Sequence, residues 1–218
     1  MEKIKPLKEM TPKERVSYIF DYYKFHILGV LVAIIVIVSI VRTLVAYRDP
    51  VIELLMVNAE VADTDALQDS FNELLTENGL DPKKNCVQIN DSLVIDFDNT
   101  ANYQEQATLQ VFVVSGTYSG FFSDEATFEH YKGRNIFCDL EQLLSKELLE
   151  PYASDLIYDT DPDTGRSYVC GIHLTQENNA WLADNQAYEE CYFGIPFSDT
   201  EKTLTVALLM HILSAPVQ

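Results

Sequence analysis

The chain has 218 residues, of which 47% are hydrophobic, and its net charge is −19 because 34 acidic residues stand against 15 basic ones. The charge is unevenly divided, since residues 49–218 contain 30 acidic and 7 basic residues, a net charge of −23. A nucleic-acid-binding domain needs a positive surface that displaces counterions, and so does a domain that lies on anionic lipid. The composition therefore argues against both functions, and an acidic surface of this kind chiefly keeps a domain soluble.

An amphipathic segment comes first in the chain, at residues 1–26. Thr11 and Glu14 form a capping box with Pro12 at the first helical position, so a helix is predicted to begin there. Apolar side chains then follow at helical spacing: Val16, Ile19, Phe20, Tyr23 and Ile27. Two interpretations stay open, an interfacial helix against the inner leaflet or a partner subunit, and a plain extension of the membrane anchor into the headgroups.

The next feature is an uninterrupted apolar run at residues 27–41. With its flank it predicts a transmembrane helix over residues 27–47, about 21 residues, which is long enough for the hydrocarbon core of a bilayer. The basic residues that precede the span predict a single-pass protein of the cell membrane with a cytoplasmic N-terminus and an extracellular C-terminal domain. A cleaved signal is the rival interpretation, but Leu44 stands where a cleavage site needs a small residue, so a retained anchor is favoured.

Residues 49–218 are long enough for one domain or for two small lobes. Asp65 followed by Gln68 predicts the start of a helix that ends at Gly79. Short apolar runs predict three strands around this helix: residues 51–57, 86–89 and 93–97. The order strand, helix, strand indicates a mixed-sheet α/β domain with at least one parallel pair.

Residues 103–114 fit two secondary structures. Their many β-branched residues favour a strand. Helical spacing favours a helix that Asn99 or Thr100 caps and Gly116 ends. The stripe that shows this spacing is Tyr103, Ala107, Gln110, Val111 and Val114. The helix is the preferred prediction, for a reason that comes from the resemblance described below.

Seven further elements are predicted after Gly116. The strands are residues 118–122, a hairpin of 155–158 and 167–173, and residues 191–197. One helix begins at residues 123–125 and ends at Gly133, and another covers residues 140–149. The last helix begins at a capping box, residues 198–201, and carries Leu204, Ala207, Leu208, His211 and Ile212.

The four cysteines are Cys86, Cys138, Cys170 and Cys191. Cys170 and Cys191 each fall in a predicted strand, so they are the preferred disulfide pair in an oxidising compartment. Free buried thiols remain the alternative, because cysteine also behaves as a small core residue.

Asp159, Asp161 and Asp163 alternate as the ligands of a calcium loop do. Thr164 and Cys170, however, stand where such a loop needs glycine and a bidentate glutamate, so turn residues are the preferred interpretation over a metal site. The sequence predicts no cofactor.

Residues 116–120 resemble a nucleophile elbow, but Tyr118 occupies the serine position and Ser119 comes one place late. An extracytoplasmic hydrolase is therefore the least supported interpretation, and no enzyme activity is predicted. His173 ends a predicted strand and is a candidate to point into a cleft. The aromatic residues around positions 118–131, with Trp181 and Tyr192, suit either a binding wall or plain core.

Residues 103–144 resemble the central segment of the two-lobed extracytoplasmic solute-binding proteins of ABC importers. The resemblance is carried by Gly116, residues 118–122, Asp124, Phe128, Tyr131 and residues 139–144, with residues 168–172 and 192–196 similar to the return strands of that family. Residues 10–15 and 21–27 are similar to a group of uncharacterised single-span membrane proteins of Gram-positive anaerobes. The chain departs from the importer family in its short outer domain, its helical anchor and its lack of a lipid-attachment cysteine.

The resemblance implies a helix before Gly116 and a membrane-anchored, solute-binding-like domain, an accessory subunit beside a transporter. It also implies that Thr117, Tyr118, Ser119 and the loop with Asp124 border a ligand cleft, to which His173 is added as a candidate. The alternative is a protein-interaction module of a membrane complex that keeps the fold without a ligand. The sequence does not identify the ligand or the membrane-protein partner.

Overall fold

The computed structural model describes residues 11–197 and 202–213. The chain divides into two compact units, Met1–Tyr47 and Arg48–Gln218. The capping box predicted at residues 198–201 lies outside the described residues, as do most of the side chains of the predicted amphipathic segment.

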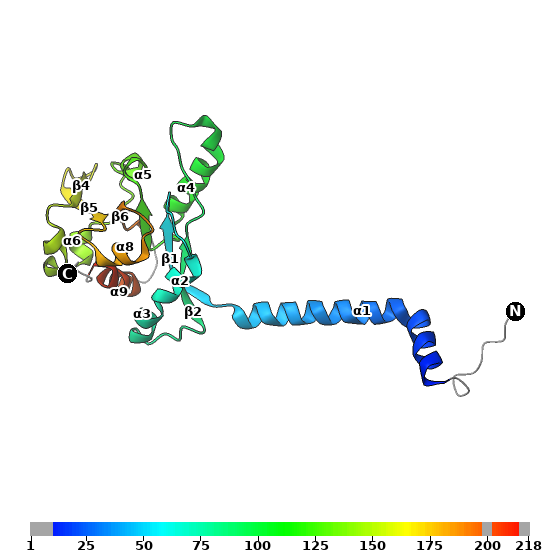
Figure 1. The fold of residues 1–218 in the computed structure, drawn as a ribbon. Coiled ribbons are helices and arrows are strands. Elements are labelled where there is room, and N and C mark those ends of the chain that lie inside the picture. The colour runs from blue at the N-terminus through cyan, green and yellow to red at the C-terminus, as the bar shows by residue number, and fades with distance from the viewer. Residues whose placement is uncertain (1–10, 198–201, 214–218) are drawn as a thin grey trace. The chain divides into compact units, whose positions relative to one another are not determined.

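The first unit contains one long helix, α1, which covers Pro12–Ala46 and begins at the predicted proline (Figure 1). Its part Tyr23–Ala46, 24 residues long, is the one helix in the described chain that is long and apolar enough to cross a membrane. At about 1.5 Å per residue this part exceeds the thickness of a hydrocarbon core. None of its apolar side chains is buried by protein, so the helix needs a lipid or protein environment.

The second unit is built on one six-stranded sheet with the order β2-β1-β3-β6-β5-β4. β2 and β3 both run parallel to β1, and the remaining neighbours are antiparallel. The strands are β1 Asp49–Met56, β2 Asn85–Asn90, β3 Gly120–Ser123, β4 Leu156–Thr160, β5 Ser167–Thr175 and β6 Glu190–Gly194. The mixed-sheet α/β prediction is confirmed. The alternative of two small lobes is wrong, because a single sheet runs through the whole unit.

The parallel strands explain which helices cover which face. β1 connects to β2 through α2 (Thr64–Ser70) and α3 (Asn72–Glu77), and β2 connects to β3 through α4 (Tyr103–Ser115). The first connection moves to one side of β1 and the second to the other. Because parallel crossovers are right-handed, the two connections must cover opposite faces of the sheet.

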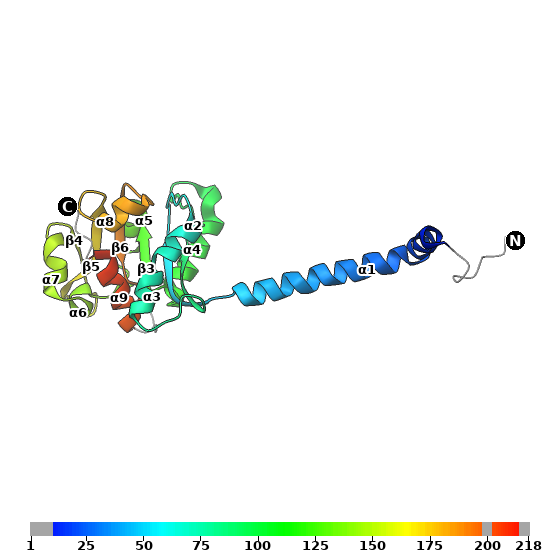
Figure 2. The ribbon, with the colours of Figure 1, turned by 60° about the horizontal axis from the view of Figure 1, so that its bottom comes forward.

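The remaining helices of the second unit are short. They are α5 Glu125–Tyr131, α6 Leu140–Leu143, α7 Lys146–Leu149, α8 Ala180–Asn185 and α9 Lys202–Leu213, with short 3-10 turns at Thr100–Asn102 and Glu150–Tyr152. α3 and α9 lie side by side (Figures 1 and 2).

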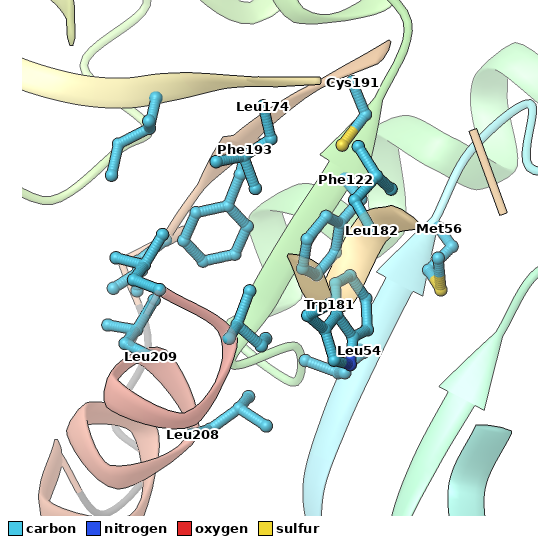
Figure 3. Packing of buried hydrophobic residues seen from close by; sticks show 14 of the residues in the cluster. Leu54, Met56, Phe122, Leu174, Trp181, Leu182, Cys191, Phe193, Leu208 and Leu209 are labelled. Carbon is cyan, nitrogen blue, oxygen red and sulfur yellow. The ribbon is translucent and has the colours of Figure 1, made fainter. Parts of the chain in front are cut away.

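Two hydrophobic cores result, one on each face of the sheet. The core under α2, α3, α8 and α9 contains Phe122 from β3, Phe193 from β6 and Trp181 from α8, which pack together in Figure 3. The core under α4 and α5 contains Leu109 and Phe128 with other buried residues. Alternation along β1 and β3 separates the two sets, because Leu54, Met56 and Phe122 belong to one core and Leu55, Val57 and Phe121 to the other.

Helix α4 confirms the preferred prediction for residues 103–114. β-branched residues favour strands locally, but β2 and β3 are both parallel to β1, and a parallel connection needs a crossover. Gly116 ends the helix in the left-handed conformation (φ 70°), as predicted. The residues that showed helical spacing do not form its buried face, since Leu109 and Val113 are buried while Val111 and Val114 face outward.

Residues 93–97, predicted to be a strand, are extended without joining the sheet. Asn58 donates to the carbonyl of Ile95 (3.0 Å) and accepts from its amide (2.6 Å). Asn102 donates to the carbonyl of Val94 on the other side of the segment (3.1 Å). The strand prediction is wrong, because these side-chain bonds, together with one bond from the backbone amide of Asn58 to the carbonyl of Leu93 (3.0 Å), satisfy the backbone without a strand ladder.

Two predicted helices are also corrected. The helix at residues 140–149 is broken into α6 and α7, because Leu144 is extended (ψ 152°). The first helix after β1 is capped by Asp63, whose carboxylate accepts from the amide of Ala66 (3.0 Å), and not by Asp65. α8 was missed because it has only six residues, too few for a helical period to show.

Candidate functional site

The carboxyl ends of β1 and β3 are where an α/β sheet of this topology ordinarily binds a ligand. The chain leaves β1 toward α2 on one face of the sheet and leaves β3 toward α5 on the other, which creates a crevice between the two strand ends. Here the crevice is filled by Tyr188, which is only 7% exposed and comes from the loop after α8. Its hydroxyl donates to the carbonyl of Val57 at 2.8 Å and lies 3.3 Å from the carbonyl of Phe122.

The backbone closes the same crevice further. The amide of Val57 donates to the carbonyl of Phe122 (2.8 Å), and the amide of Glu60 donates to that of Ala187 (2.9 Å). Burial raises the pKa of the Tyr188 phenol well above its usual value, so this hydroxyl stays protonated and keeps its bond to the carbonyl. The place that the fold offers for a ligand is therefore occupied by the protein itself.

Asn58 and Asn179 hold the segments that border this closed crevice. Asn58 lies in the left-handed region (φ 59°), which asparagine tolerates, and its side chain anchors residues 93–95. Asn179 is completely buried and caps α8 through the amide of Leu182 (2.9 Å), while its amide group donates to Tyr152 and to the carbonyl of Ile212. Neither asparagine was singled out from the sequence, since each acts through contacts distant in the chain.

The structure separates the residues that were predicted to share a ligand cleft. Thr117, Tyr118 and Ser119 lie just before β3, whereas Asp124 lies just after it. Five extended residues span roughly 16 Å, so the two groups stand at opposite ends of the strand. The structure therefore does not bring the two groups together.

Each of these side chains has a structural role or is exposed. Tyr118 is buried, and its hydroxyl accepts from the amide group of Asn90 (2.8 Å). Ser119 is 1% exposed, so it cannot meet a substrate as a nucleophile. Asp124 caps α5 through the amide of Thr127 (3.2 Å).

His173 lies on a different strand, β5, at the same end of the sheet as Asp124, because it pairs with Tyr192, which pairs in turn with Ser123. Its ring stacks on Tyr192 with 4.7 Å between centroids, and its Nε2 is 3.1 Å from a carboxylate oxygen of Glu190. This is a cross-strand cluster at the β5–β6 pair, where His173 and Tyr192 are in register. Thr117, Tyr118 and Ser119 lie at the opposite end of β3 from this cluster.

Asp124 borders a hollow of about 480 Å³ beside α5. Phe97 and His130 stack there with 4.0 Å between ring centroids. Burial, with the nearby Arg134, lowers the pKa of the His130 imidazole. Asp96 and Asp98 also line the hollow, but Asp96 accepts from the amide of Asp98, as a turn residue does.

Of the three alternating aspartates, Asp159 lies in β4, and Asp161 and Asp163 lie in the turn between β4 and β5. Asp161 accepts from the amides of Asp163 (2.8 Å) and Thr164 (3.2 Å), and these bonds lower the pKa of its carboxyl. Asp159 accepts from the amide of Gly133 (2.7 Å). No set of three potential metal ligands converges anywhere among the described residues.

The predicted disulfide between Cys170 and Cys191 is absent, and all four cysteines are free thiols. Cys170 belongs to the core beneath α4 and α5, whereas Cys191 belongs to the core on the other face. A bond between them would have to pass through the sheet. Burial raises the pKa of Cys170 to about 12 and that of Cys191 further, which keeps both thiols protonated.

A groove of about 450 Å³ lies between α2 and α8. Its walls include Leu67, Trp181 and His211, and its rim includes Asp63 and Asp184. Within the described part of the chain, no acceptor lies within hydrogen-bonding distance of the indole nitrogen of Trp181, although that atom is buried. Indole nitrogens that are buried ordinarily find a partner.

The outward face of α4 is the most unusual surface of the second unit. Tyr103, Val111 and Val114 are 75%, 64% and 67% exposed, and Ala107 between them is exposed too. The only other exposed side chains on the helix are the uncharged Gln104, Gln110 and Ser115. No charged residue occurs between Glu105 and Asp124.

Comparison with models of known protein families, with characterised proteins and with solved structures gives no match to this chain. The resemblance to solute-binding proteins therefore stays an expectation from the sequence. What the chain does has to be argued from the geometry above.

Proposed function

We propose that the protein is a membrane-anchored interaction module, held by α1, whose α/β domain lies outside the cell and contacts another protein through the outer face of α4. The observation that carries the proposal is the exposed apolar stripe of Tyr103, Ala107, Val111 and Val114. Valine is a poor helix former, and exposed valines contribute nothing to the core. Their presence on the solvent side is explained if another surface covers them.

The closed crevice supports the same proposal over solute binding. A solute-binding domain needs a cavity at the strand ends or between two lobes. The second unit has one sheet, and Tyr188 fills the space at its carboxyl edge. A domain whose usual ligand-binding crevice is filled by its own side chain is better suited to bind another protein through its surface.

Placement outside the cell rests on the charge distribution. The segment before the apolar helix holds Lys3, Lys5, Lys8, Lys13 and Arg15, whereas residues 49–218 carry a net charge of −23. Basic flanks stay cytoplasmic. Protease added to intact cells is expected to remove the domain, and full protection of the domain would overturn this part of the proposal.

The interaction itself is tested with a photo-crosslinking amino acid at position 111 of the full chain in native membranes. The matched control carries the same amino acid at position 77, where Glu77 is exposed at the end of α3. A crosslinked protein product from position 111, and none from position 77, is the expected result. No product at 111, or equal products at both positions, would overturn the interaction function.

A second candidate function, binding of a small molecule, is favoured by the groove that Trp181 lines. A flat apolar body with an acceptor would satisfy the unpartnered indole N–H, and a cationic group would pair with Asp63 or Asp184. Trp181 is the only tryptophan of the chain, so its fluorescence reports on this groove alone.

The test titrates the full chain in detergent with a panel of aromatic amines and follows tryptophan fluorescence. A saturable change that Asp184→Asn weakens is expected for a binding groove. A flat fluorescence signal across the panel would remove this candidate and leave the interaction function standing.

A further inference from the structure

From the shape and charge of the α4 stripe, and resting on the proposed interaction function, we infer that the partner is a second copy of this chain. The two copies pair through α4 in antiparallel orientation about a two-fold axis. The argument has three parts: charge, sequence symmetry and size.

The negative charge of the domain disfavours contact between two copies through most of its surface. The domain carries a net charge of −23, so two copies that approach through most of its surface bring carboxylates together. The stretch between Glu105 and Asp124 has no charged residue, and the side chains of it that α4 exposes are Ala107, Gln110, Val111, Val114 and Ser115. Two α4 faces can therefore meet without like-charge repulsion.

The stripe is also nearly symmetric about its own centre. Its members are spaced by four, four and three residues, so a reversed copy of the stripe matches it to within one residue. In an antiparallel pair, Tyr103 of one copy lies against Val114 of the other, and Ala107 lies against Val111. Each pair combines a larger and a smaller side chain, which is the self-complementarity that a two-fold interface requires.

The size of the stripe sets the strength of the contact. From Tyr103 to Val114 it is about 16 Å long, at 1.5 Å per residue. An interface of this size lies below the standard for stable complexes, so the dimer is weak in free solution. Chains anchored by α1 diffuse in two dimensions, which raises their effective concentration and favours the pair in a membrane.

The test uses cysteine variants of the full chain, with the unchanged chain as the background control. Ala107→Cys and Val111→Cys are expressed together in one membrane and exposed to an oxidant. The proposed register places these two positions opposite each other, so a disulfide-linked dimer is expected from the mixture. Glu77→Cys, on another surface, is the matched control and is expected to give no dimer.

A second measurement follows the mass of the full chain in detergent by light scattering. The unchanged chain is expected to show a dimer that dissociates on dilution, and Val111→Glu with Val114→Glu is expected to abolish the dimer. Tyr158→Glu with Met210→Glu adds the same charges at exposed apolar positions elsewhere (53% and 46% exposed) and is expected to leave the dimer intact.

The outcomes separate this inference from the proposed function. A monomer at all concentrations, with no dimer from the cysteine mixture, overturns the second copy as partner, whereas a photo-crosslink from position 111 to a different protein keeps the interaction function. A dimer that survives Val111→Glu with Val114→Glu also overturns the inference, because it must form through another surface.

Discussion

The closed crevice at the end of β3 and the outward face of α4 differ in what they expose. The crevice buries hydrogen-bonded polar groups, whereas the helix face exposes apolar side chains. At the crevice, Tyr188 and Asn58 satisfy backbone groups of segments that are distant in the chain. On α4, valines that could have been buried stand in solvent instead. In this domain, long-range hydrogen bonds close the crevice where such folds usually bind a ligand. Its exposed apolar surface lies instead on α4, the helix of a parallel crossover.

The largest expected effect is on thiol reactivity, which distinguishes the buried interior from the exposed face of α4. Since burial raises the pKa of Cys170 from 9.0 to about 12, its thiolate fraction at neutral pH falls roughly a thousandfold. A fifth thiol at the exposed position 111, from Val111→Cys, should react at once with a disulfide reagent. Cys170 and Cys191 should react only on unfolding, with four thiols counted for the unchanged chain in denaturant without reductant. A count of two would show a disulfide.

Opening the crevice should cost the most stability. Tyr188→Ala removes a buried ring and the hydrogen bond to Val57, for an expected loss of about 3–5 kcal/mol in the free energy of unfolding. Tyr188→Phe keeps the ring and leaves the carbonyl unpaired, for about 1–3 kcal/mol. Both are measured by unfolding of the full chain in detergent. Equal losses would mean that the ring contributes nothing beyond the hydroxyl, and no loss in Tyr188→Phe would mean that the hydroxyl contributes nothing.

The buried phenol of Tyr188 also predicts that the free energy of unfolding depends on pH. Above pH 10 the unfolded chain deprotonates this tyrosine, while the folded chain keeps the proton because the folded pKa is raised. Stability therefore falls as the pH rises through this range, and the fall should be shallower in Tyr188→Phe than in the unchanged chain. Parallel stability curves for the two chains would contradict the burial argument.

Asn58 is expected to matter next. Asn58→Ala loses both bonds to Ile95 and places a Cβ-bearing residue without local support at positive φ, for an expected loss of about 2 kcal/mol. Asn58→Gly tolerates that φ, so the difference between the two variants isolates backbone strain from the lost hydrogen bonds. If Asn58→Gly were as stable as the unchanged chain, the anchoring of residues 93–95 would be unimportant.

The smallest effect on stability is predicted for α4. Val111→Glu with Val114→Glu should change the free energy of unfolding of the monomer by less than about 0.5 kcal/mol per site, because both side chains are exposed and glutamate is a better helix former. The helical signal in circular dichroism should be unchanged. A large loss of stability would show that these valines are buried in the monomer, and the contrast with the crevice would disappear.

Local sequence signals determined much of the fold. Apolar runs located β1 and β2, Gly116 located the end of α4, and Pro12 located the start of α1. These signals work because periodicity, caps and left-handed glycines act over a few neighbouring residues. The sequence alone also showed where the acidic charge lies and which helix is apolar enough to cross a membrane.

Only the tertiary structure decided which faces are buried and which residues meet. The apolar residues at helical spacing on α4 face outward, because Leu109 and Val113 are the residues of this helix that are buried in the core beneath it. The residues expected to share a cleft stand at opposite ends of β3, and Cys170 and Cys191 lie on opposite faces of the sheet. Such outcomes depend on strand order and register, which arise from contacts between residues far apart in the chain and leave no mark at any single position.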